Sequence, residues 1–231
     1  MKILECKDVC KNFGPKKVLQ NINLEIESGK IIGLLGPNGS GKTTLIKLIN
    51  DLLTPTSGSI EIKGMNPGIE TKKIVSYLPD KTYLNDDMNV AELITFFKDF
   101  YEDFDEKKAR KLMKNLHLEE KEKLKNMSKG TKEKVQLILV MSRKADLYVL
   151  DEPIGGVDPA ARDYILDTIL NNLNENSSLI ISTHLITEIE KILDEVIFIK
   201  DGKIVLDNSA DEIRSQTGKS IDELFREEFK C

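Results

Sequence analysis

The hydrophobic and polar positions in the first third of the chain follow the pattern of an α/β protein. Polar and apolar residues alternate over 21–27, which predicts a strand with one buried face. A continuous apolar run over 31–35 predicts a strand buried on both faces, as in a parallel sheet. Helical spacing over 45–53 stops before Pro55 and predicts a helix. Further short strands are predicted over 59–63 and 74–78.

The middle of the chain has a different pattern. Between Met88 and Arg143 apolar residues recur at helical spacing among dense mixed charge, which predicts helices over 89–103, 105–117 and 130–143. Strand patterns then return, separated in part by helical ones. The predicted strands are 147–150, 179–183, 196–199 and 203–206, and the predicted helices are 160–173, 186–193 and 220–229. Strands that alternate with helices indicate a parallel sheet, so the predicted fold class is α/β with an inserted helical subdomain.

Composition narrows the class of protein. The 231 residues are 40% hydrophobic and 32% charged, which is an ordinary globular balance. The net charge of −5 gives no support for a nucleic-acid-binding surface. No apolar run approaches the roughly 20 residues that cross a bilayer, and the first residues lack the apolar stretch of a signal peptide. We therefore expect a cytoplasmic protein whose three cysteines, Cys6, Cys10 and Cys231, are reduced thiols.

A glycine-rich loop lies between the buried strand and the helix that follows it. It reads Gly36-Pro37-Asn38-Gly39-Ser40-Gly41-Lys42-Thr43, which fits G-x-x-x-x-G-K-[ST]. Glycines let the backbone approach phosphates closely, and the amides at the start of the helix favour negative charge. Lys42 could reach the β- and γ-phosphates of a nucleotide, and the Thr43 hydroxyl could bind Mg²⁺. The alternative, a chance glycine-rich turn, is disfavoured by the flanking strand and helix.

Two acidic residues end the apolar strand over 147–150. Sites in open α/β sheets lie at the carboxyl ends of strands. Asp151 could therefore hold Mg²⁺ through its waters, and Glu152 could polarise an attacking water. A strand that simply ends in a polar turn is the alternative, and the phosphate loop makes it the weaker one.

These motifs and their order carry a resemblance to a known family. Over nearly its whole length the chain resembles the nucleotide-binding subunits of ABC transporters. The Gly36–Thr43 loop is similar to the Walker A motif, and 147–152 is similar to the Walker B motif with its catalytic glutamate. The remaining matches are Met127-Ser128-Lys129-Gly130-Thr131 at the signature motif, Gly155-Gly156-Val157-Asp158-Pro159 at the D-loop, Ser182-Thr183-His184 at the switch histidine, and Phe13 at the adenine-stacking aromatic.

The resemblance implies a P-loop NTPase core with a parallel sheet, an N-terminal antiparallel β subdomain and an inserted α-helical subdomain. We expect one ABC ATPase domain over 1–231, with core segments 1–79 and 144–206, a helical subdomain over 80–143 and a tail over 207–231. It also implies ATP and Mg²⁺ as cofactors, a transmembrane permease subunit, and a second ATP-binding subunit packed head to tail, in a homo- or heterodimer. Each ATP then lies between the phosphate loop of one chain and the signature motif of the other.

The site residues implied by the resemblance fall into three groups. The expected catalytic residues are Glu152, His184 and Lys42. The expected nucleotide-binding residues are Phe13, Gly36, Pro37, Asn38, Gly39, Ser40, Gly41, Lys42, Thr43, Thr44, Ser128, Gly130 and Asp158. The expected Mg²⁺ ligands are Thr43, Asp80 and Asp151. His117, in contrast, is expected on a charged helix with a structural role.

The chain departs from the family in two places. Asp80 stands where the family has a glutamine that contacts Mg²⁺ and water. We hypothesise that Asp80 still approaches the metal, the alternative being that it caps the following segment. In the signature motif, Lys129 replaces a glycine and Thr131 replaces a glutamine. Lys129 either adds positive charge near the γ-phosphate or points into solvent, which is the usual place of a lysine.

Five aromatic residues cluster within nine positions. Phe96, Phe100 and Phe104 fall on one helical stripe, and Phe97 and Tyr101 on the next. Both stripes could pack inside the helical subdomain. Alternatively, one stripe lines a groove for a cytoplasmic helix of the membrane partner, as the resemblance implies. Under the second hypothesis Phe97→Ala would lose membrane association and keep its ATPase activity.

The predicted function is an ATP-hydrolysing subunit that powers a separate transmembrane subunit from the cytoplasmic face of the membrane. Export is favoured because the tail Ile221-Asp222-Glu223-Leu224-Phe225 is similar to exporter subunits. One alternative is a soluble ABC ATPase that acts on nucleic acid or ribosomes, but the single unit and the acidic balance disfavour it. Another is an unrelated P-loop enzyme such as a nucleotide kinase, which the signature and D-loop segments disfavour. The subunit does not touch the transported substrate, so the sequence carries no trace of it.

Overall fold

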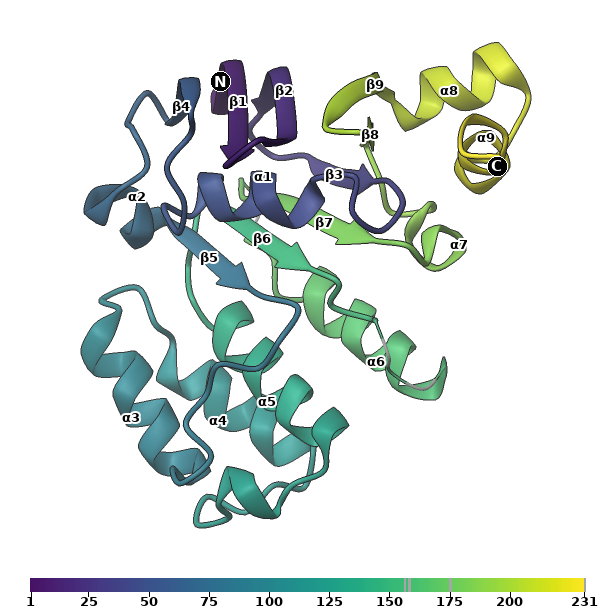
Figure 1. The fold of residues 1–231 in the computed structure, drawn as a ribbon. Coiled ribbons are helices and arrows are strands. Elements are labelled where there is room, and N and C mark those ends of the chain that lie inside the picture. Colours follow the sequence, from purple (N-terminus) through teal and green to yellow (C-terminus); the bar gives the residue numbers. More distant parts are fainter. Residues whose placement is uncertain (156, 158, 175, 231) are drawn as a thin grey trace.

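The computed structural model describes residues 1–155, 157, 159–174 and 176–230, and leaves the side chains of Ala160 and Ala161 undescribed. A mostly parallel six-stranded sheet forms the centre of the molecule, in the order β5-β6-β7-β3-β8-β9 (Figure 1). Only the pairing of β8 with β9 is antiparallel. The strands are β3 (Ile31–Leu35), β5 (Val75–Leu78), β6 (Leu147–Asp151), β7 (Ser178–Thr183), β8 (Glu195–Lys200) and β9 (Lys203–Ser209).

A smaller antiparallel sheet has the order β2-β1-β4. Its strands are β1 (Lys2–Phe13), β2 (Lys16–Glu27) and β4 (Ser57–Ile62). Helix α1 (Lys42–Ile49) lies between the two sheets, and its residues Leu45, Ile46, Leu48 and Ile49 share one apolar cluster with both. This sandwiched position fixes α1, and so fixes the loop that leads into it.

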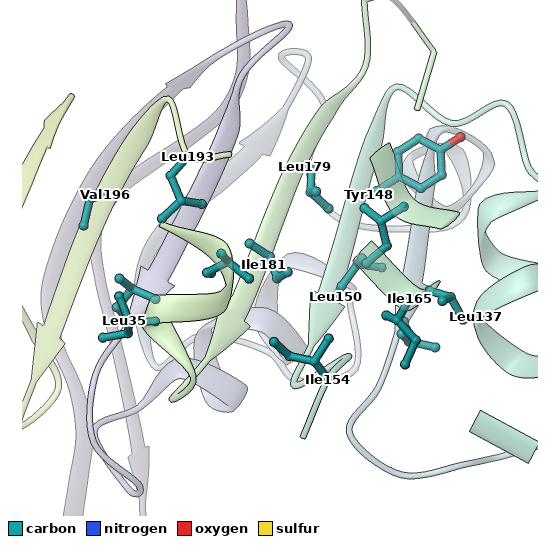
Figure 2. Close-up of a cluster of buried hydrophobic side chains, with 14 of the residues drawn as sticks. Leu35, Leu137, Tyr148, Leu150, Ile154, Ile165, Leu179, Ile181, Leu193 and Val196 are labelled. Carbon is teal, nitrogen blue, oxygen red and sulfur yellow. The ribbon is translucent and has the colours of Figure 1, made fainter. Parts of the chain in front are cut away.

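A second apolar cluster covers the opposite face of the six-stranded sheet (Figure 2). It packs side chains of β3, β6 and β7, such as Leu35, Leu150 and Ile181, against the helices of that face. These helices are α6 (Pro159–Leu170), α7 (Ile186–Ile189), α8 (Ala210–Thr217) and α9 (Ile221–Glu228). In α9, Leu224 and Phe225 pack against the same cluster. The tail segment over 221–225, which is similar to exporter subunits, therefore also packs against the core.

Three α-helices and a short 3-10 helix form a separate subdomain beside β5 and β6 (Figure 1). They are α3 (Val90–Phe100), α4 (Glu106–Asn115), η1 (Leu124–Asn126) and α5 (Lys129–Met141). Asn89, Asp105 and Ser128 cap the three α-helices through their side chains. A third apolar cluster lies inside the subdomain, while Leu137, Val140 and Met141 of α5 belong to the sheet cluster. Helix α5 is thus shared by both units.

The predicted fold class is confirmed, and each predicted strand and helix overlaps an observed one. The sequence pattern missed β1, α2 (Ile69–Ile74) and α8. Strand β1 escaped because bulges interrupt its alternation, and one of them contains Asp8 at φ 48°. The prediction for α7 was four residues too long, since the chain turns at Glu190 toward β8. His117, expected on a helix, follows the end of α4 at φ 55°.

The fold also shows which of the clustered aromatic residues are buried and which are exposed. Phe97 is buried at 2% exposure, whereas Phe96 and Phe100 are 50% and 69% exposed and stack with ring centroids 5.7 Å apart. Phe97 is part of the subdomain core and cannot line a docking groove. Phe97→Ala is therefore the wrong variant to test docking. The exposed pair lies on the other stripe. Among the described residues, no helix combines the length and the apolar character that a membrane span requires.

Candidate active site: a phosphate loop beside paired carboxylates

The phosphate loop, Gly36–Thr43, leaves the carboxyl end of β3 and enters α1. Glycine is required at both ends of the turn. A Cβ on Gly36 would lie 2.3 Å from the Ile199 carbonyl oxygen, and Gly41 has φ +115° with Leu19 only 2.7 Å from a Cβ there. The loop is therefore packed closely against β2 and β8, with no room for a side chain at either glycine.

Lys42 is the first residue of α1 and is only 6% exposed. Its Nζ donates to the carbonyl oxygens of Gly36 at 2.7 Å and Pro37 at 3.3 Å. Burial lowers the pKa of Lys42, while the negative charges of Glu152 and Asp151 act in the opposite direction. A desolvated ammonium that donates to neutral carbonyls is well suited to bind phosphate.

The loop borders an open cavity of about 1030 Å³. The predicted residues that line it come from five different segments of the chain. They are Phe13, Asn38, Gly39, Gly41, Lys42, Thr43, Thr44, Asp80, Glu152 and His184. Gly36, Pro37 and Ser40 do not line it, although they belong to the same loop.

The paired carboxylates stand where β6 and β7 end side by side. Asp151 lies opposite Ser182 in the parallel register, and the Ser182 hydroxyl donates to Asp151 Oδ1 at 2.6 Å. The other oxygen, Oδ2, is buried and has no hydrogen-bond partner in the part of the chain that the structure describes. A buried carboxylate oxygen without a donor is costly, so it fits a site for a cation or its bound water.

Glu152 and His184 form a pair above these strand ends. Glu152 Oε2 lies 2.9 Å from His184 Nδ1. Glu152 has φ 51°, and its amide donates to the Ser182 carbonyl at 2.8 Å. This left-handed turn directs the Glu152 side chain away from the strand and into the cavity. The sequence predicted both residues, and the structure brings them together from positions 32 residues apart.

Asp80 and Phe13 also line the cavity. Asp80 is exposed and makes no side-chain hydrogen bond within the described residues, so nothing there supports a capping role. Phe13 is 47% exposed, with Lys11 Nζ 5.1 Å from its ring centroid. One aromatic face at the rim of the cavity is available to stack on a nucleobase.

The signature motif lies at the N-terminus of α5. Ser128 Oγ caps the helix by accepting from the Thr131 amide at 3.2 Å. A Cβ on Gly130 would meet no atom within 4 Å, so packing within this chain does not require a glycine there. Ser128 and Gly130 are absent from the cavity lining, whereas Lys129, which is 84% exposed, reaches it. Asp158 of the D-loop lies outside the described residues.

Comparison with known proteins decides the family. The ABC transporter family model matches residues 19–155, which contain the phosphate loop, the signature motif and both carboxylates. The chain belongs to the ABC transporter ATP-binding family. It is therefore an ATPase.

Relatives of this ABC ATPase cover most of its length. The SkfA peptide export ATP-binding protein SkfE of Bacillus subtilis (strain 168) is 33% identical over 90% of this chain and 89% of its own. The ABC transporter ATP-binding protein YtrB of the same organism is 29% identical over 93% and 74%. A solved ATP-binding subunit of an ABC transporter superposes with a TM-score of 0.88 at 28% identity, covering 97% of this chain and 98% of the other.

Sequence reasoning missed several other residues that line the ABC ATPase cavity. They are Lys16, Lys17, Val18, Gln20, Asp201 and Gly202. The Gly202 amide donates to the Ser40 carbonyl at 2.9 Å, and the Gln20 amide donates to the Gly202 carbonyl at 2.8 Å. The turn between β8 and β9 thereby braces the phosphate loop. An Asp-Gly pair signals a turn in sequence, but not which distant loop the turn touches.

Proposed function

We propose that this ATP-binding protein works as a dimer that hydrolyses MgATP between its copies and drives a separate transmembrane subunit. One observation carries the proposal. The cavity gathers Lys42, Glu152 and His184 of one chain, while Ser128 and Gly130 stand outside it on an open helix N-terminus. A second copy that supplies this N-terminus would complete the site, because helix N-termini favour phosphate.

The proposed chemistry is in-line attack of water on the γ-phosphate. Glu152 orients the water and accepts its proton, and His184 holds the Glu152 carboxylate in place and can donate to the γ-phosphate. Lys42 exchanges its two carbonyl partners for phosphate oxygens. The dimer is stable only while the γ-phosphate is intact, so hydrolysis releases it.

Mg²⁺ would supply charge stabilisation to the phosphates when bound. The residues present fit such an ion. Asp151 Oδ2 is buried without a donor among the described residues, and Thr43, the last residue of the phosphate loop, is exposed. We propose that Thr43 and Asp151 hold the ion, with the Asp80 carboxylate facing it across the cavity.

A groove between the two subdomains is the proposed docking site of the transmembrane partner. It has a volume of about 550 Å³, and its lining includes Leu52, Tyr77, Tyr83, Phe100 and Tyr101. Leu52, Tyr83 and Phe100 are each more than half exposed, which is unusual for such large apolar side chains. An amphipathic cytoplasmic helix of a membrane protein fits a groove of this composition. This contact would hold the protein at the cytoplasmic face of the membrane.

Export is the proposed direction of transport. It is supported by relatives named for peptide export, in SkfE, and for linearmycin resistance, in LnrL, which is 29% identical over 94% of this chain. Two measurements on one variant test the docking site of the membrane partner. Phe100→Ala should abolish co-purification with the membrane subunit and leave ATPase activity in solution unchanged. Retained co-purification would exclude the groove as the docking site.

The hydrolytic site is tested with two substitutions and one control. Lys42→Ala and Glu152→Gln should each lower kcat by a factor of about 100 or more, since each removes a group aimed at the transition state. Lys47→Ala, on the exposed face of the same helix as Lys42, should leave kcat unchanged. Glu152→Gln with MgATP should form a dimer in solution scattering. If scattering showed a monomer under conditions in which the protein binds MgATP, the dimeric site would be rejected.

A further inference from the structure

Two chain segments leave the paired ends of β6 and β7 and carry the proposed catalytic pair. The first runs from Glu152 to the start of α6, and the second runs from His184 through α7. At the strand ends the backbone holds them together, since the Glu152 amide donates to the Ser182 carbonyl. Beyond the strands, the 2.9 Å contact between Glu152 and His184 depends on where each segment goes next.

The segment that carries His184 depends on neighbouring elements for its position. Helix α7 has only four residues, which is too short to be stable alone. The His184 side chain is 52% exposed, and its one side-chain hydrogen bond within the described residues is the contact with Glu152. Ile186 and Ile189 anchor the buried side of α7, but apolar contacts fix burial better than they fix direction.

Besides the contact between Glu152 and His184, hydrogen bonds of Arg162 in α6 connect the two segments. Its Nε donates to the Val157 carbonyl at 3.2 Å, and its Nη1 donates to Glu188 Oε1 at 3.1 Å. The Arg162 side chain is 21% exposed and that of Glu188 is 36% exposed. A planar guanidinium that bonds two partners fixes their relative placement more strictly than a single contact would.

The far side of α7 is held by different elements. Arg214 of α8 donates to the Glu190 carbonyl, and the Asp222 amide of α9 donates to Glu190 Oε2 at 3.2 Å. These contacts fix the end of the segment that points away from the cavity. Within the described residues, Arg162 is thus the side chain that ties α7 to the Glu152 side of the site.

We propose that Arg162 is a positioning residue for ATP hydrolysis. By joining the Val157 backbone to Glu188, it keeps the His184 segment at the distance from which His184 meets Glu152. Arg162 is not among the residues that line the cavity, so it acts on turnover rather than on nucleotide binding. The inference rests on the proposed roles of Glu152 and His184.

The test compares steady-state ATPase kinetics of Arg162→Ala, Arg162→Lys and Glu188→Ala in the full chain. We expect Arg162→Ala to lower kcat by about threefold to tenfold with KM for ATP changed less than about twofold, because misplaced catalytic groups slow the chemical step. Arg162→Lys should recover part of the loss, since a lysine keeps the charge but not the fork. Glu188→Ala should match Arg162→Ala, and the double variant should be no slower than either.

Lys219→Ala provides the matched control. It removes an exposed ion pair at 2.6 Å between Lys219, which precedes α9, and Glu227 of α9; the pair involves neither Arg162 nor Glu188, so kcat should stay unchanged. A wild-type kcat in Arg162→Ala, or additive losses in the double variant, would overturn the inference. Glu152→Gln is measured in parallel. If Glu152→Gln is inactive and Arg162→Ala is fully active, only the role of Arg162 fails; if Glu152→Gln is active, the proposed site fails.

Discussion

The glycines of this protein are required for different reasons, some by packing within the chain and one by the proposed partner. Gly36 and Gly41 are fixed by their own chain, because a Cβ on either would collide with β8 or β2. Gly130 has open space around it and a backbone outside the left-handed region. A glycine that its own fold does not need is explained by the proposed approach of a second molecule.

Gly130→Ala separates the two constraints. Alanine is a better helix former than glycine, so the free energy of unfolding of the isolated chain should rise by about 0.5 kcal/mol. MgATP-dependent dimerisation in a Glu152→Gln background should weaken, because the added methyl group stands between the helix N-terminus and the bound phosphate. Chemical denaturation and light scattering measure the two effects. Gly64→Ala, at φ +74° with open space, should lower stability and leave dimerisation intact.

Cys6 gives a residue-scale prediction about pH. It is 1% exposed, and burial raises the pKa of its thiol from 9.0 to about 12. The folded thiol stays protonated where the unfolded thiol ionises, so its contribution to stability is complete below pH 9 and is lost as the pH rises toward 12. Between pH 8 and pH 10 the loss should be about 1.4 kcal/mol.

This loss is measured as a difference. Denaturation of the wild-type protein and of Cys6→Ala at both pH values cancels the titration of all other groups. The variant should be less stable overall because of its cavity, but its stability should fall less steeply with pH. Parallel pH profiles for the two proteins would show that Cys6 is not the titrating group.

At the scale of elements, α3 has one buried aromatic face and one exposed aromatic face. Phe97 packs inward against Tyr101 and Phe104, with ring centroids 5.7 Å apart in both pairs. Phe100 points outward, at the rim of the groove between the subdomains. Helical spacing predicts two stripes, but α3 ends at Phe100, so Phe104 leaves its stripe and packs on Phe97. The position of α4 and α5 then decides which face of α3 is covered.

Phe97→Ala and Phe100→Ala should therefore differ sharply in stability. The first creates a cavity in the subdomain core and should lower the free energy of unfolding by about 3–4 kcal/mol. The second removes an exposed ring and should change it by less than about 0.5 kcal/mol. Denaturant titration of both variants gives the comparison. Equal losses would mean that Phe100 is also a core residue.

At the scale of the whole molecule, Arg143 joins the helical subdomain to the sheet. It is 3% exposed and lies just beyond α5, the helix that both units share. Its guanidinium donates to the carbonyls of Val75 at 2.6 Å and Lys73 at 2.8 Å, and to Asp103 Oδ1 at 3.0 Å. It also stacks 3.8 Å from the Tyr101 ring centroid. One buried charge thus links groups from both sides of the proposed docking groove.

Arg143→Lys should weaken the contact between the helical subdomain and the sheet. The lysine keeps a charge at the buried position but cannot satisfy the carbonyls and the carboxylate together, so stability should fall by about 2–4 kcal/mol. Amide hydrogen exchange should accelerate in α3 and α4 more than in β3 and β7, whose hydrogen bonds lie within the sheet. Lys144→Ala, next in sequence and exposed, is the control. Uniform acceleration across the chain would mean that the two units do not separate.

The sequence by itself determined the class of fold and most of the chemistry of the site. Local patterns carry that information, because strand alternation, helical spacing and the glycine-rich loop depend on residues close together in the chain. The same patterns predicted Lys42, Asp151 and Glu152, and the family resemblance added His184. The patterns failed for β1, whose bulges break the alternation, and for the short helices α2 and α8.

Only the tertiary structure decided which distant residues meet. The 2.9 Å contact between Glu152 and His184 exists because β6 and β7 are neighbours in the sheet, and no local pattern states the order of parallel strands. The same holds for the turn at Gly202 that braces the phosphate loop, and for Arg162, which in sequence is one more charge on a helix. Burial likewise separates Phe97 from Phe100. Each of these facts depends on packing between segments far apart in the chain, which spacing along the sequence does not encode.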